Sequence, residues 1–555
     1  CIRDRVEAGV IKDQLNAYLK PFGYFFSPEL STSNRATLGG MISTDASGQG
    51  SLVYGKTSDH VLGLKAVLLG GEVLDTCAIP VSEAERRAGQ PGAEGQIYRV
   101  VLDRCRLQRD LIIEKFPKLN RFLTGYDLRH VLSDDLQQVD LTRILCGAEG
   151  TLAFIAEATL DITPIPKVRR LVNIKYDSFD SALRNAPFMV AANALSVETV
   201  DSKVLNLARE DIVWHSVNEL ITDVPYKEML GLNMVEFAGN DKPLIDSQVD
   251  ALCQRLDALM AQQEGGIIGY QLCNDVAGIE RIYGMRKKAV GLLGNAKGRA
   301  KPIPFVEDTC VPPQNLADYI VEFRALLDGH NLSYGMFGHV DAGVLHVRPA
   351  LDMCDPQQER LMKQISDEVV ALTARYGGLL WGEHGKGFRA EYSPSFFGET
   401  LYDELRRIKA AFDPANRLNP GKICAPLGVD DPMLKVDAVK RGTWDRQIPI
   451  NVRTDWRGAM ECNGNGLCFN FDAKSPMCPS MKITSNRMHS PKGRATLTRE
   501  WLRLLAEQGV DPQVLEQQLP SKGISLRGMI QRTRNSWQAT VSYTHLRAHE
   551  TAANL

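Results

Sequence analysis

The chain has 555 residues, of which 44% are hydrophobic and 24% are charged. This length predicts roughly three or four domains with more than one buried core. The 65 basic and 67 acidic residues give a formal net charge of −2, which excludes a strong electrostatic surface for nucleic acid or an anionic membrane. No uncharged apolar run reaches the roughly 18 residues that a transmembrane helix needs.

The two ends of the chain have unusual sequences. The chain begins at Cys1 without an initiator methionine, in a segment where Ile11, Leu15 and Leu19 already have the spacing of an amphipathic helix. We therefore expect the natural start to precede it. At the other end, residues 541–555 resemble the translated read-through of a sequencing adapter, and we expect them to be a non-native tail.

Short strands and glycine-rich turns are predicted from about residue 27 to 165, as in a mixed α+β domain. Two segments, 36–48 and 147–152, are rich in small residues that let the backbone approach a planar or phosphorylated ligand. Each segment alone is typical of a tight turn. Together they suit a cofactor that lies between loops.

Strands and helices alternate in a second domain that starts near residue 168. This order favours an antiparallel sheet with helices on one face. Residues 426–460 are predicted to be an extended linker, and residues 495–540 to be helical. The strands expected in the second domain are 171–176, 234–238, 305–309, 333–337 and 344–347, and the helices are 180–192, 243–263, 314–328 and 356–376.

The strongest chemical pattern in this second domain combines two histidines and a glutamate. His339 and His346 can converge across a strand–turn–strand, and Glu383 can supply a third ligand while other coordination positions stay open. A divalent ion there could hold an α-hydroxy acid, while His384 accepts the hydroxyl proton and the α-hydrogen leaves as hydride to a flavin. For a single histidine, a hydrogen-bonded place in the core is the commoner explanation.

Most of the 12 cysteines lie in apolar patterns, which predicts buried thiols and a reducing cytosol. We therefore expect a cytoplasmic protein, with a peripheral position on the inner membrane left open. Cys462, Cys468 and Cys478 are different, because the spacing and the final Cys-Pro are similar to one arm of a ferredoxin-like cluster site. A 4Fe-4S cluster needs a fourth ligand, expected outside this sequence. Zinc or free thiols are the alternatives.

These segments resemble a known family. Residues 36–48 and the loop at 147–152 look like flavin loops of the domain shared with vanillyl-alcohol oxidase and para-cresol methylhydroxylase. Residues 339–346, 383–385 and 418–422 resemble the substrate domain of D-lactate, glycolate and D-2-hydroxyglutarate dehydrogenases. With the cysteine segment, the resemblance extends over about 1–540 to the large bacterial D-2-hydroxyglutarate dehydrogenases that fuse flavin and iron-sulfur domains.

The resemblance implies an α+β fold in three parts. Residues 1–167 would form the C-terminal part of a vanillyl-alcohol-oxidase-type FAD-binding domain. Residues 168–425 would form a ferredoxin-like domain of the FAD-linked oxidase C-terminal type, which holds substrate and metal. Residues 426–540 would form a linker and the start of a mostly helical, 4Fe-4S ferredoxin-like domain.

The resemblance also implies roles for individual residues. His339, His346 and Glu383 would bind a divalent metal, usually zinc, and His384 would be the base. Arg286 and Lys301 would contact the substrate carboxylate, although a solvated surface charge is the alternative for both. The implied FAD contacts are Pro28, Thr37, Gly40, Asp45, Ser47, Gly48, Tyr54, Gly55, Asp59, Glu149, Gly150, Ile155 and Asn419.

The sequence therefore predicts FAD-dependent oxidation of a D-2-hydroxy acid, foremost D-2-hydroxyglutarate to 2-oxoglutarate. Electrons would leave through iron-sulfur clusters to a quinone or another carrier. D-lactate or glycolate oxidation, or a non-catalytic flavin or electron-transfer subunit, are the alternatives, and a homo-oligomer is left open. The candidate cations for a distal substrate carboxylate are Arg286, Lys301, Lys386 and Arg389.

Overall fold

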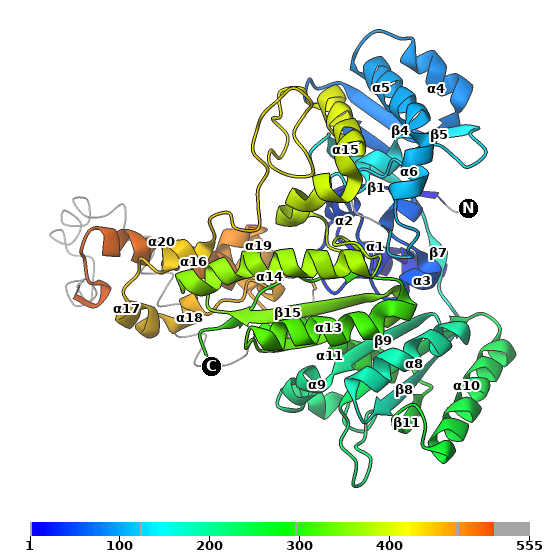
Figure 1. Cartoon of the computed structure of the whole chain (residues 1–555), viewed down its shortest axis with the longest axis vertical. Coiled ribbons are helices and arrows are strands. Elements are labelled where there is room, and N and C mark those ends of the chain that lie inside the picture. The colour runs from blue at the N-terminus through cyan, green and yellow to red at the C-terminus, as the bar shows by residue number, and fades with distance from the viewer. Residues whose placement is uncertain (1–2, 123–124, 295–297, 473–474, 476, 515–555) are drawn as a thin grey trace. The chain divides into compact units, whose positions relative to one another are not determined.

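The structure is a computed structural model that describes residues 3–122, 125–294, 298–472, 475 and 477–514 (Figure 1). The chain divides into two compact units. The larger consists of Cys1–Ala296, Lys301–Ala350 and Met362–Ala438, and the smaller of Lys297–Ala300, Leu351–Leu361 and Val439–Leu555. In the part of the chain described, no helix is long and apolar enough to cross a membrane.

The first sheet of the larger unit has five antiparallel strands in the order β1-β6-β3-β4-β5. A separate two-stranded ladder joins β2 to β7. The strands are β1 (Arg3–Glu7), β2 (Tyr24–Phe25), β3 (Val61–Val67), β4 (Val73–Pro80), β5 (Gln138–Asp140), β6 (Phe154–Asp161) and β7 (Thr163–Pro164), and the early helices are α1 (Lys12–Leu19), α2 (Leu38–Thr44), α3 (Ser51–Tyr54) and α7 (Thr142–Leu145).

Three further helices lie between β4 and β5, where the sequence analysis expected only short strands and turns. They are α4 (Val81–Ala88), α5 (Ala93–Leu107) and α6 (Arg109–Lys115). That expectation is wrong for this stretch. In α5 the buried residues Ile97, Val101 and Cys105 recur every four residues, which is the spacing of one helix face.

The second sheet has eight strands, with β11-β8-β10-β9-β14-β15-β12 as the main order and β13 paired to β15. The predicted helices of this domain are confirmed to within two residues at each end. The strands are β8 (Val168–Tyr176), β9 (Ser196–Asp201), β10 (Gly231–Gly239), β11 (Ile267–Cys273), β12 (Lys301–Pro302), β13 (Thr309–Cys310), β14 (Tyr334–His339) and β15 (Val344–Leu351), and the helices are α8 (Phe179–Ala191), α9 (Ser202–Arg209), α10 (Lys242–Gln262), α11 (Val276–Lys287), α12 (Ala289–Gly294), α13 (Leu316–Gly329) and α14 (Pro356–Arg375).

Helices cover both faces of this second sheet, so the expectation of helices on one face is wrong. In β8, the hydroxyl of Tyr176 lies 4.0 Å from the sulfur of Met189 in α8, whereas the amide of Asn173 donates to the Leu220 carbonyl at 3.3 Å. Even and odd residues of a strand point to opposite faces. The segment after α9 therefore packs on the face opposite α8, which explains why consecutive residues of β8 are buried.

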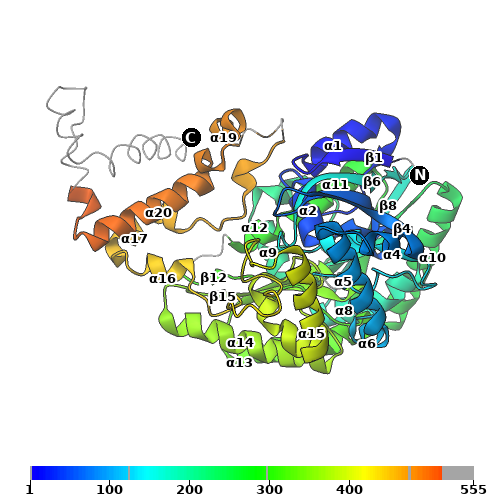
Figure 2. The ribbon, with the colours of Figure 1, turned by 90° about the horizontal axis from the view of Figure 1, so that it is seen from above.

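Helix α15 (Ser393–Phe412) packs against α5 of the first domain (Figure 2). The Gln108 amide donates to Glu404 of α15 at 3.3 Å. One hydrophobic core cluster includes Leu64 of the first sheet together with Trp381 and Leu401. The loop that carries Glu383 and His384 is therefore packed against the first domain, which contains β1 to β7, as well as against the second sheet.

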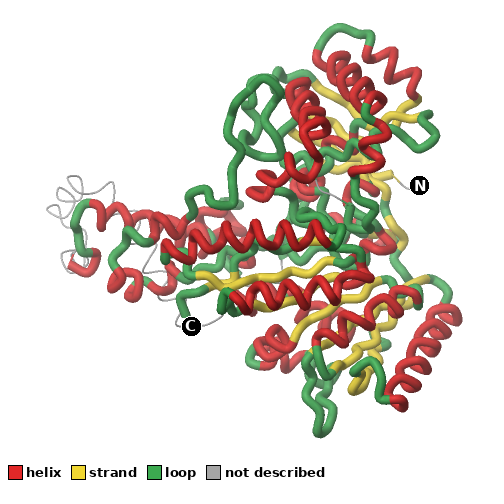
Figure 3. Tube along the Cα trace, in the orientation of Figure 1, coloured by secondary structure: helices red, strands yellow, loops and turns green. Residues whose placement is uncertain are grey.

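The smaller unit is mostly helical (Figure 3). Ile448, Val452 and Leu502 form its core cluster. The prediction of an extended linker over 426–460 is wrong from Arg441 on, and the predicted helix at 495–540 is confirmed as far as Glu507. Residues 515–540 and the expected tail at 541–555 lie outside the described residues. Its helices are α16 (Arg441–Asp445), α17 (Ile450–Asp455), α18 (Arg457–Met460), α19 (Pro479–Thr484) and α20 (Pro491–Glu507).

Candidate active site

Two histidines lie at the end of the hairpin formed by β14 and β15. His339 ends β14 and pairs with Val344, and His346 pairs with Phe337 across the ladder. The turn between them requires a glycine, because Gly343 has a φ of +70° and a Cβ there would lie 1.9 Å from the Val311 carbonyl oxygen. The predicted strand–turn–strand is confirmed, and it brings the two rings to a centroid distance of 5.5 Å.

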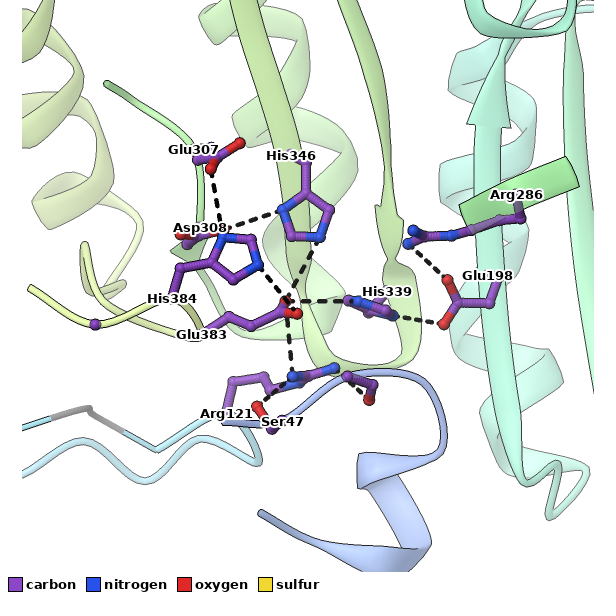
Figure 4. Close-up of polar contacts among 12 residues, drawn as sticks. Ser47, Arg121, Glu198, Arg286, Glu307, Asp308, His339, His346, Glu383 and His384 are labelled. Atoms are coloured by element: carbon purple, nitrogen blue, oxygen red, sulfur yellow. Dashed lines mark hydrogen bonds and ion pairs between the residues drawn. The ribbon is translucent and has the colours of Figure 1, made fainter. Parts of the chain in front are cut away.

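Glu383 completes a group of three buried side chains (Figure 4). Its Oε2 atom lies 3.5 Å from Nε2 of His339 and 3.5 Å from Nε2 of His346. Each of the three side chains is at most 6% exposed. The loop reaches this position because the amide of Gly382 donates to the Asp308 carbonyl at 3.1 Å. One ligand atom from each side chain lies within 4.8 Å of the others, so the structure brings the three predicted metal ligands together.

Carboxylates on the far side of each histidine determine which ring nitrogen faces Glu383. Nδ1 of His339 lies 2.5 Å from Glu198 in β9, and Nδ1 of His346 lies 3.0 Å from Asp308. If each Nδ1 donates, both Nε2 lone pairs point at the Oε2 atom of Glu383, which has no hydrogen-bond donor. Three acceptors that face one another need a cation between them, so the residues present fit a divalent metal.

The electrostatics of the three side chains differ. Burial lowers the pKa of His346, which keeps its imidazole neutral. Burial would also lower the pKa of His339, but the carboxylates of Glu198 and Glu383 outweigh it and raise that pKa. Burial alone would raise the pKa of Glu383, but the charges of His339 and Arg121 outweigh it and hold that pKa well below its usual value. A metal that displaces the proton of His339 would then meet two imidazoles and one carboxylate.

His384 lies beside this group but is far more accessible. Its side chain is 45% exposed, and its ring lies parallel to that of His346, with centroids 5.1 Å apart. Nδ1 of His384 is 2.9 Å from Asp308 and 3.3 Å from Glu307, and its Nε2 is 3.4 Å from Glu383. Burial would lower the pKa of His384, but the carboxylates of Asp308 and Glu383 outweigh it and raise that pKa well above its usual value. This accessible imidazole therefore binds a proton strongly, and it must be free of one before it can accept the proton of a bound hydroxyl.

A pocket with an empty volume of about 470 Å³ opens onto these side chains. Arg286 lies at the end of α11, with Nη2 2.8 Å from Glu198 and its guanidinium 5.0 Å from the Phe337 ring centre. Gly48 also lines the pocket, so the first glycine-rich segment and the metal-type group face the same space. The lining residues are Glu29, Leu30, Ser31, Gly48, Gln49, Glu198, Arg286, Lys287, Phe337, His339, His346, Arg348, Glu383 and His384.

Of the four cations that the sequence offered for a distal carboxylate, only Arg286 lines this pocket. Lys301 is in β12. Lys386 is buried with its ammonium 3.8 Å from the Trp381 ring centre, and burial lowers its pKa to about 7. Arg389 donates to Asp308 and to backbone carbonyls of its own loop. The structure instead places Lys287 and Arg348 in the pocket, and the predicted role of Lys301 stays a prediction.

Several side chains predicted to contact FAD are bonded to other protein groups. Asp45 has a φ of +50°, and its carboxylate accepts from Lys56 Nζ at 2.5 Å and from the Ser58 amide at 2.8 Å. Asp59 accepts from Arg143 at 2.9 Å. Flavin contacts from these positions would therefore come from the backbone.

The second glycine-rich loop is bonded to the loop that carries the candidate base. The carboxylate of Glu149 accepts from the backbone amides of Lys386 and Gly387. Asn419 donates to the Glu149 carbonyl at 2.6 Å. These residues hold the two loops together, and their contacts with a flavin stay predictions. The same is true of Pro28, Thr37, Gly40, Gly48, Tyr54, Gly55, Gly150 and Ile155, which lie in the larger unit.

Arg121, Glu198 and Asp308 are site residues that the sequence analysis missed. Arg121 is fully buried, donates to the Ser47 hydroxyl at 2.5 Å and to the Gly48 carbonyl at 2.7 Å, and lies 3.7 Å from Glu383. Glu198 carried little signal, because only two of the six residues of β9 are apolar and the sequence therefore does not mark this strand as buried. Arg121 carried none, because it lies in a loop far from the histidines in sequence.

Cys462, Cys468 and Cys478 in the smaller unit do not form a comparable group. Their side chains are partly exposed. The thiol of Cys478 donates to the His489 carbonyl at 3.3 Å, and the sulfur of Cys468 accepts from the Lys492 amide at 3.4 Å. Among the described residues, no ligand group that could hold a metal contains a cysteine. The geometry therefore does not fit a preformed cluster site.

Known families match both parts of the larger unit. The family described as FAD binding domain matches residues 4–76, and the family described as FAD linked oxidases, C-terminal domain, matches residues 165–423. A solved structure of p-cresol methylhydroxylase with substrate bound is similar over 77% of each chain, at 14% identity and a TM-score of 0.52. The predicted α+β fold of the vanillyl-alcohol-oxidase type is confirmed.

Curated relatives are similar over nearly the whole of this chain. D-2-hydroxyglutarate dehydrogenase of Pantoea ananatis is 80% identical over 535 residues, which are 96% of this chain and 52% of the relative. The protein of the same name from Escherichia coli is 79% identical over 535 residues, 96% of this chain and 53% of the relative. The chain thus spans about half the length of the curated relatives it matches.

Proposed function

We propose that the chain is an FAD-linked oxidase that oxidises D-2-hydroxyglutarate to 2-oxoglutarate with FAD as hydride acceptor, as its family matches and its curated relatives suggest. One observation carries this proposal. The half-exposed His384 lies beside the buried His339, His346 and Glu383, in a pocket that the glycine-rich loop at Gly48 also lines. Acid–base, metal-binding and flavin-type elements therefore meet at one place, as oxidation of a hydroxy acid requires.

The chain's own residues bind the substrate and move its proton. When bound, a divalent metal would supply a Lewis acid for the substrate hydroxyl, and FAD would accept the α-hydrogen as hydride. Nδ1 of His384 is directed at Asp308, so its Nε2 is the atom that takes the hydroxyl proton as the C=O bond forms. Arg286 pairs with the substrate carboxylate next to the reacting carbon.

Two further cations support a dicarboxylate as substrate. Lys287 and Arg348 line the pocket in addition to Arg286. Lys287 lies 2.9 Å from Glu29, and Arg348 lies 2.7 Å from Glu307, so each is held in place by an acid. A five-carbon diacid has a distal carboxylate that such a cation can bind, whereas D-lactate and glycolate have none.

Anaerobic mixing of the full-length protein with three acids tests this proposal. The expected result is rapid bleaching of the flavin by D-2-hydroxyglutarate, slower bleaching by D-lactate and glycolate, and loss of both after chelation. With flavin and metal confirmed bound, absence of bleaching by any of the three would refute the dehydrogenase proposal and favour a non-catalytic subunit. Faster bleaching by D-lactate or glycolate would identify that acid, instead of D-2-hydroxyglutarate, as the substrate.

We also propose, on sequence spacing alone, that Cys462, Cys468 and Cys478 contribute to a 4Fe-4S cluster whose fourth ligand lies outside this sequence. The thiols form no metal-ligand group in the described residues, so a cluster would have to bring them together when it binds. A quinone or another one-electron carrier would be the acceptor, and the cytoplasm the proposed location. Iron and sulfide analysis of anaerobically purified protein tests the cluster, and absence of iron would refute it.

A further inference from the structure

One carboxylate oxygen serves two histidines that have different proposed roles. Oδ1 of Asp308 lies 3.0 Å from Nδ1 of His346, a proposed metal ligand, and 2.9 Å from Nδ1 of His384, the proposed base. The two imidazole planes are inclined by only 11°, which lets both Nδ1 atoms face the same oxygen. By contrast, of the side chains His339, His346, Glu383 and His384, Glu198 contacts His339 alone.

The surrounding structure fixes Asp308 firmly. Its side chain is fully buried, and its second oxygen accepts from Arg389 at 3.2 Å. The same guanidinium donates to the Gly385 carbonyl at 2.9 Å, next to His384. Asp308 also has a φ of +68°, a left-handed conformation that costs free energy in a non-glycine residue.

We infer that Asp308 is a positioning residue that fixes the tautomers of His346 and His384 together, so that metal binding and proton acceptance depend on the same carboxylate. This inference rests on the proposed function. With Nδ1–H of each ring donating to Asp308, His346 presents Nε2 to the metal and His384 presents Nε2 to the substrate hydroxyl. One carboxylate oxygen of Asp308 thus orients both the metal ligand His346 and the base His384 through the same type of hydrogen bond.

Replacing Asp308 by asparagine separates this role from simple packing, because the side chain keeps its size. If the amide oxygen faces Arg389, the NH2 group faces both Nδ1 atoms and favours the opposite tautomers. If the oxygen faces the histidines, the NH2 group opposes the Arg389 donor. Either orientation breaks one part of the arrangement.

The experiment measures metal affinity and turnover separately in Asp308→Asn, Glu198→Gln and Asp201→Asn, in the full-length protein. Asp201 is the control, since this buried acid accepts only from the backbone amides of Val204 and Met336. Metal content and chelator competition with zinc need no turnover. We expect Asp308→Asn to weaken metal binding about 10- to 100-fold, and at saturating metal to keep kcat about 100-fold or more below wild type.

Glu198→Gln should weaken metal binding similarly, but at saturating metal its defect should lie mainly in KM, because Glu198 also pairs with Arg286 and does not touch His384. Full recovery of kcat in Asp308→Asn at saturating metal, or unchanged metal affinity, would overturn the inference, as would the same losses in Asp201→Asn.

Two metal ions per wild-type chain, one of them lost in Asp308→Asn, would also overturn it, because Glu307, Asp308, His346 and His384 would then be ligands of a second ion. Failure of the wild type to oxidise any acid refutes the proposed function instead, and leaves the effect on metal affinity as a separate measurement.

Discussion

The His339–His346–Glu383 group and the cysteine segment with Cys462, Cys468 and Cys478 differ in what holds their ligand atoms. The histidines lie on hydrogen-bonded strands, are buried, and have their second nitrogen atoms bound by carboxylates. Cys468 lies in the short 3-10 helix Leu467–Phe469, and Cys478 immediately precedes α19. The three cysteines are partly exposed, and Cys468 and Cys478 make hydrogen bonds with the backbone. The first site is organised by the fold, whereas a site of the second kind must be organised by the ions it binds.

Removing a ligand from the organised site should have the largest effect. Glu383→Gln leaves two imidazoles without the carboxylate, so we expect metal loss and a fall in the rate of flavin bleaching of about 10³-fold or more. Bound flavin should remain near its wild-type amount. Stopped-flow absorbance with metal analysis measures both, and normal bleaching in metal-free Glu383→Gln would contradict the metal assignment.

Removing a thiol from the second site should spare the first site entirely. For Cys468→Ser we expect loss of iron and of electron transfer to a quinone analogue, while the flavin still bleaches at the wild-type rate. Cys253→Ser, another partly exposed cysteine but outside this segment, is the matched control and should keep its iron. Equal iron content in both variants would show that Cys468 is no ligand.

Glycine substitutions should measure how rigid the two regions are. In Gly343→Ala the new Cβ would lie 1.9 Å from the Val311 carbonyl oxygen, so we expect a loss of about 2–4 kcal/mol in the free energy of unfolding. Gly464 in the cysteine segment also has a positive φ, but its nearest neighbour is the Lys492 side chain at 3.7 Å. Gly464→Ala should therefore cost only about 1 kcal/mol. Urea denaturation compares them, and equal losses would mean that the hairpin is no more constrained than the loop.

Substrate recognition should depend only on the pocket beside the His339–His346–Glu383 group. A substitution that affects recognition alone should have the smallest effect of the four. For Lys287→Met we expect KM for D-2-hydroxyglutarate to rise about 10-fold, while KM for D-lactate stays within a factor of about two, since lactate has no distal carboxylate. Steady-state kinetics with both acids measure this. Equal increases for both acids would place Lys287 at the proximal carboxylate or at no carboxylate.

The same contrast shows what sequence can predict. The hairpin histidines and Glu383 were predictable, because ligand residues in a strand–turn–strand with glycine turns form a local pattern. Helices α8, α10, α13 and α14 were predictable from their apolar spacing. The covered second face of β8 was not, since a run of buried residues does not say which segment covers each side.

The residues that position the candidate ligands and base could not be found from local sequence patterns, because they come together only in the folded structure. Asp308 lies far from His346 in the sequence, and only the pairing of β13 with β15 brings its neighbourhood to the hairpin. Arg389 was one of four candidate cations for a distal substrate carboxylate because its charge was visible in the sequence. Its partners, the Asp308 carboxylate and three backbone carbonyls, were not visible there. A sequence shows which residues are positively charged, but it does not show which acidic group or carbonyl each of them binds.

The position of Arg121 would couple the binding of the two proposed cofactors, the flavin and the metal. One buried guanidinium is bonded to Ser47 and Gly48 of the flavin-type loop and also approaches Glu383 of the metal group. If the proposed metal draws the Glu383 carboxylate toward itself, it would change the electrostatic field at Arg121 and so the hold of Arg121 on the loop at Ser47 and Gly48. By linkage, whatever factor metal binding applies to flavin affinity, flavin binding must apply to metal affinity.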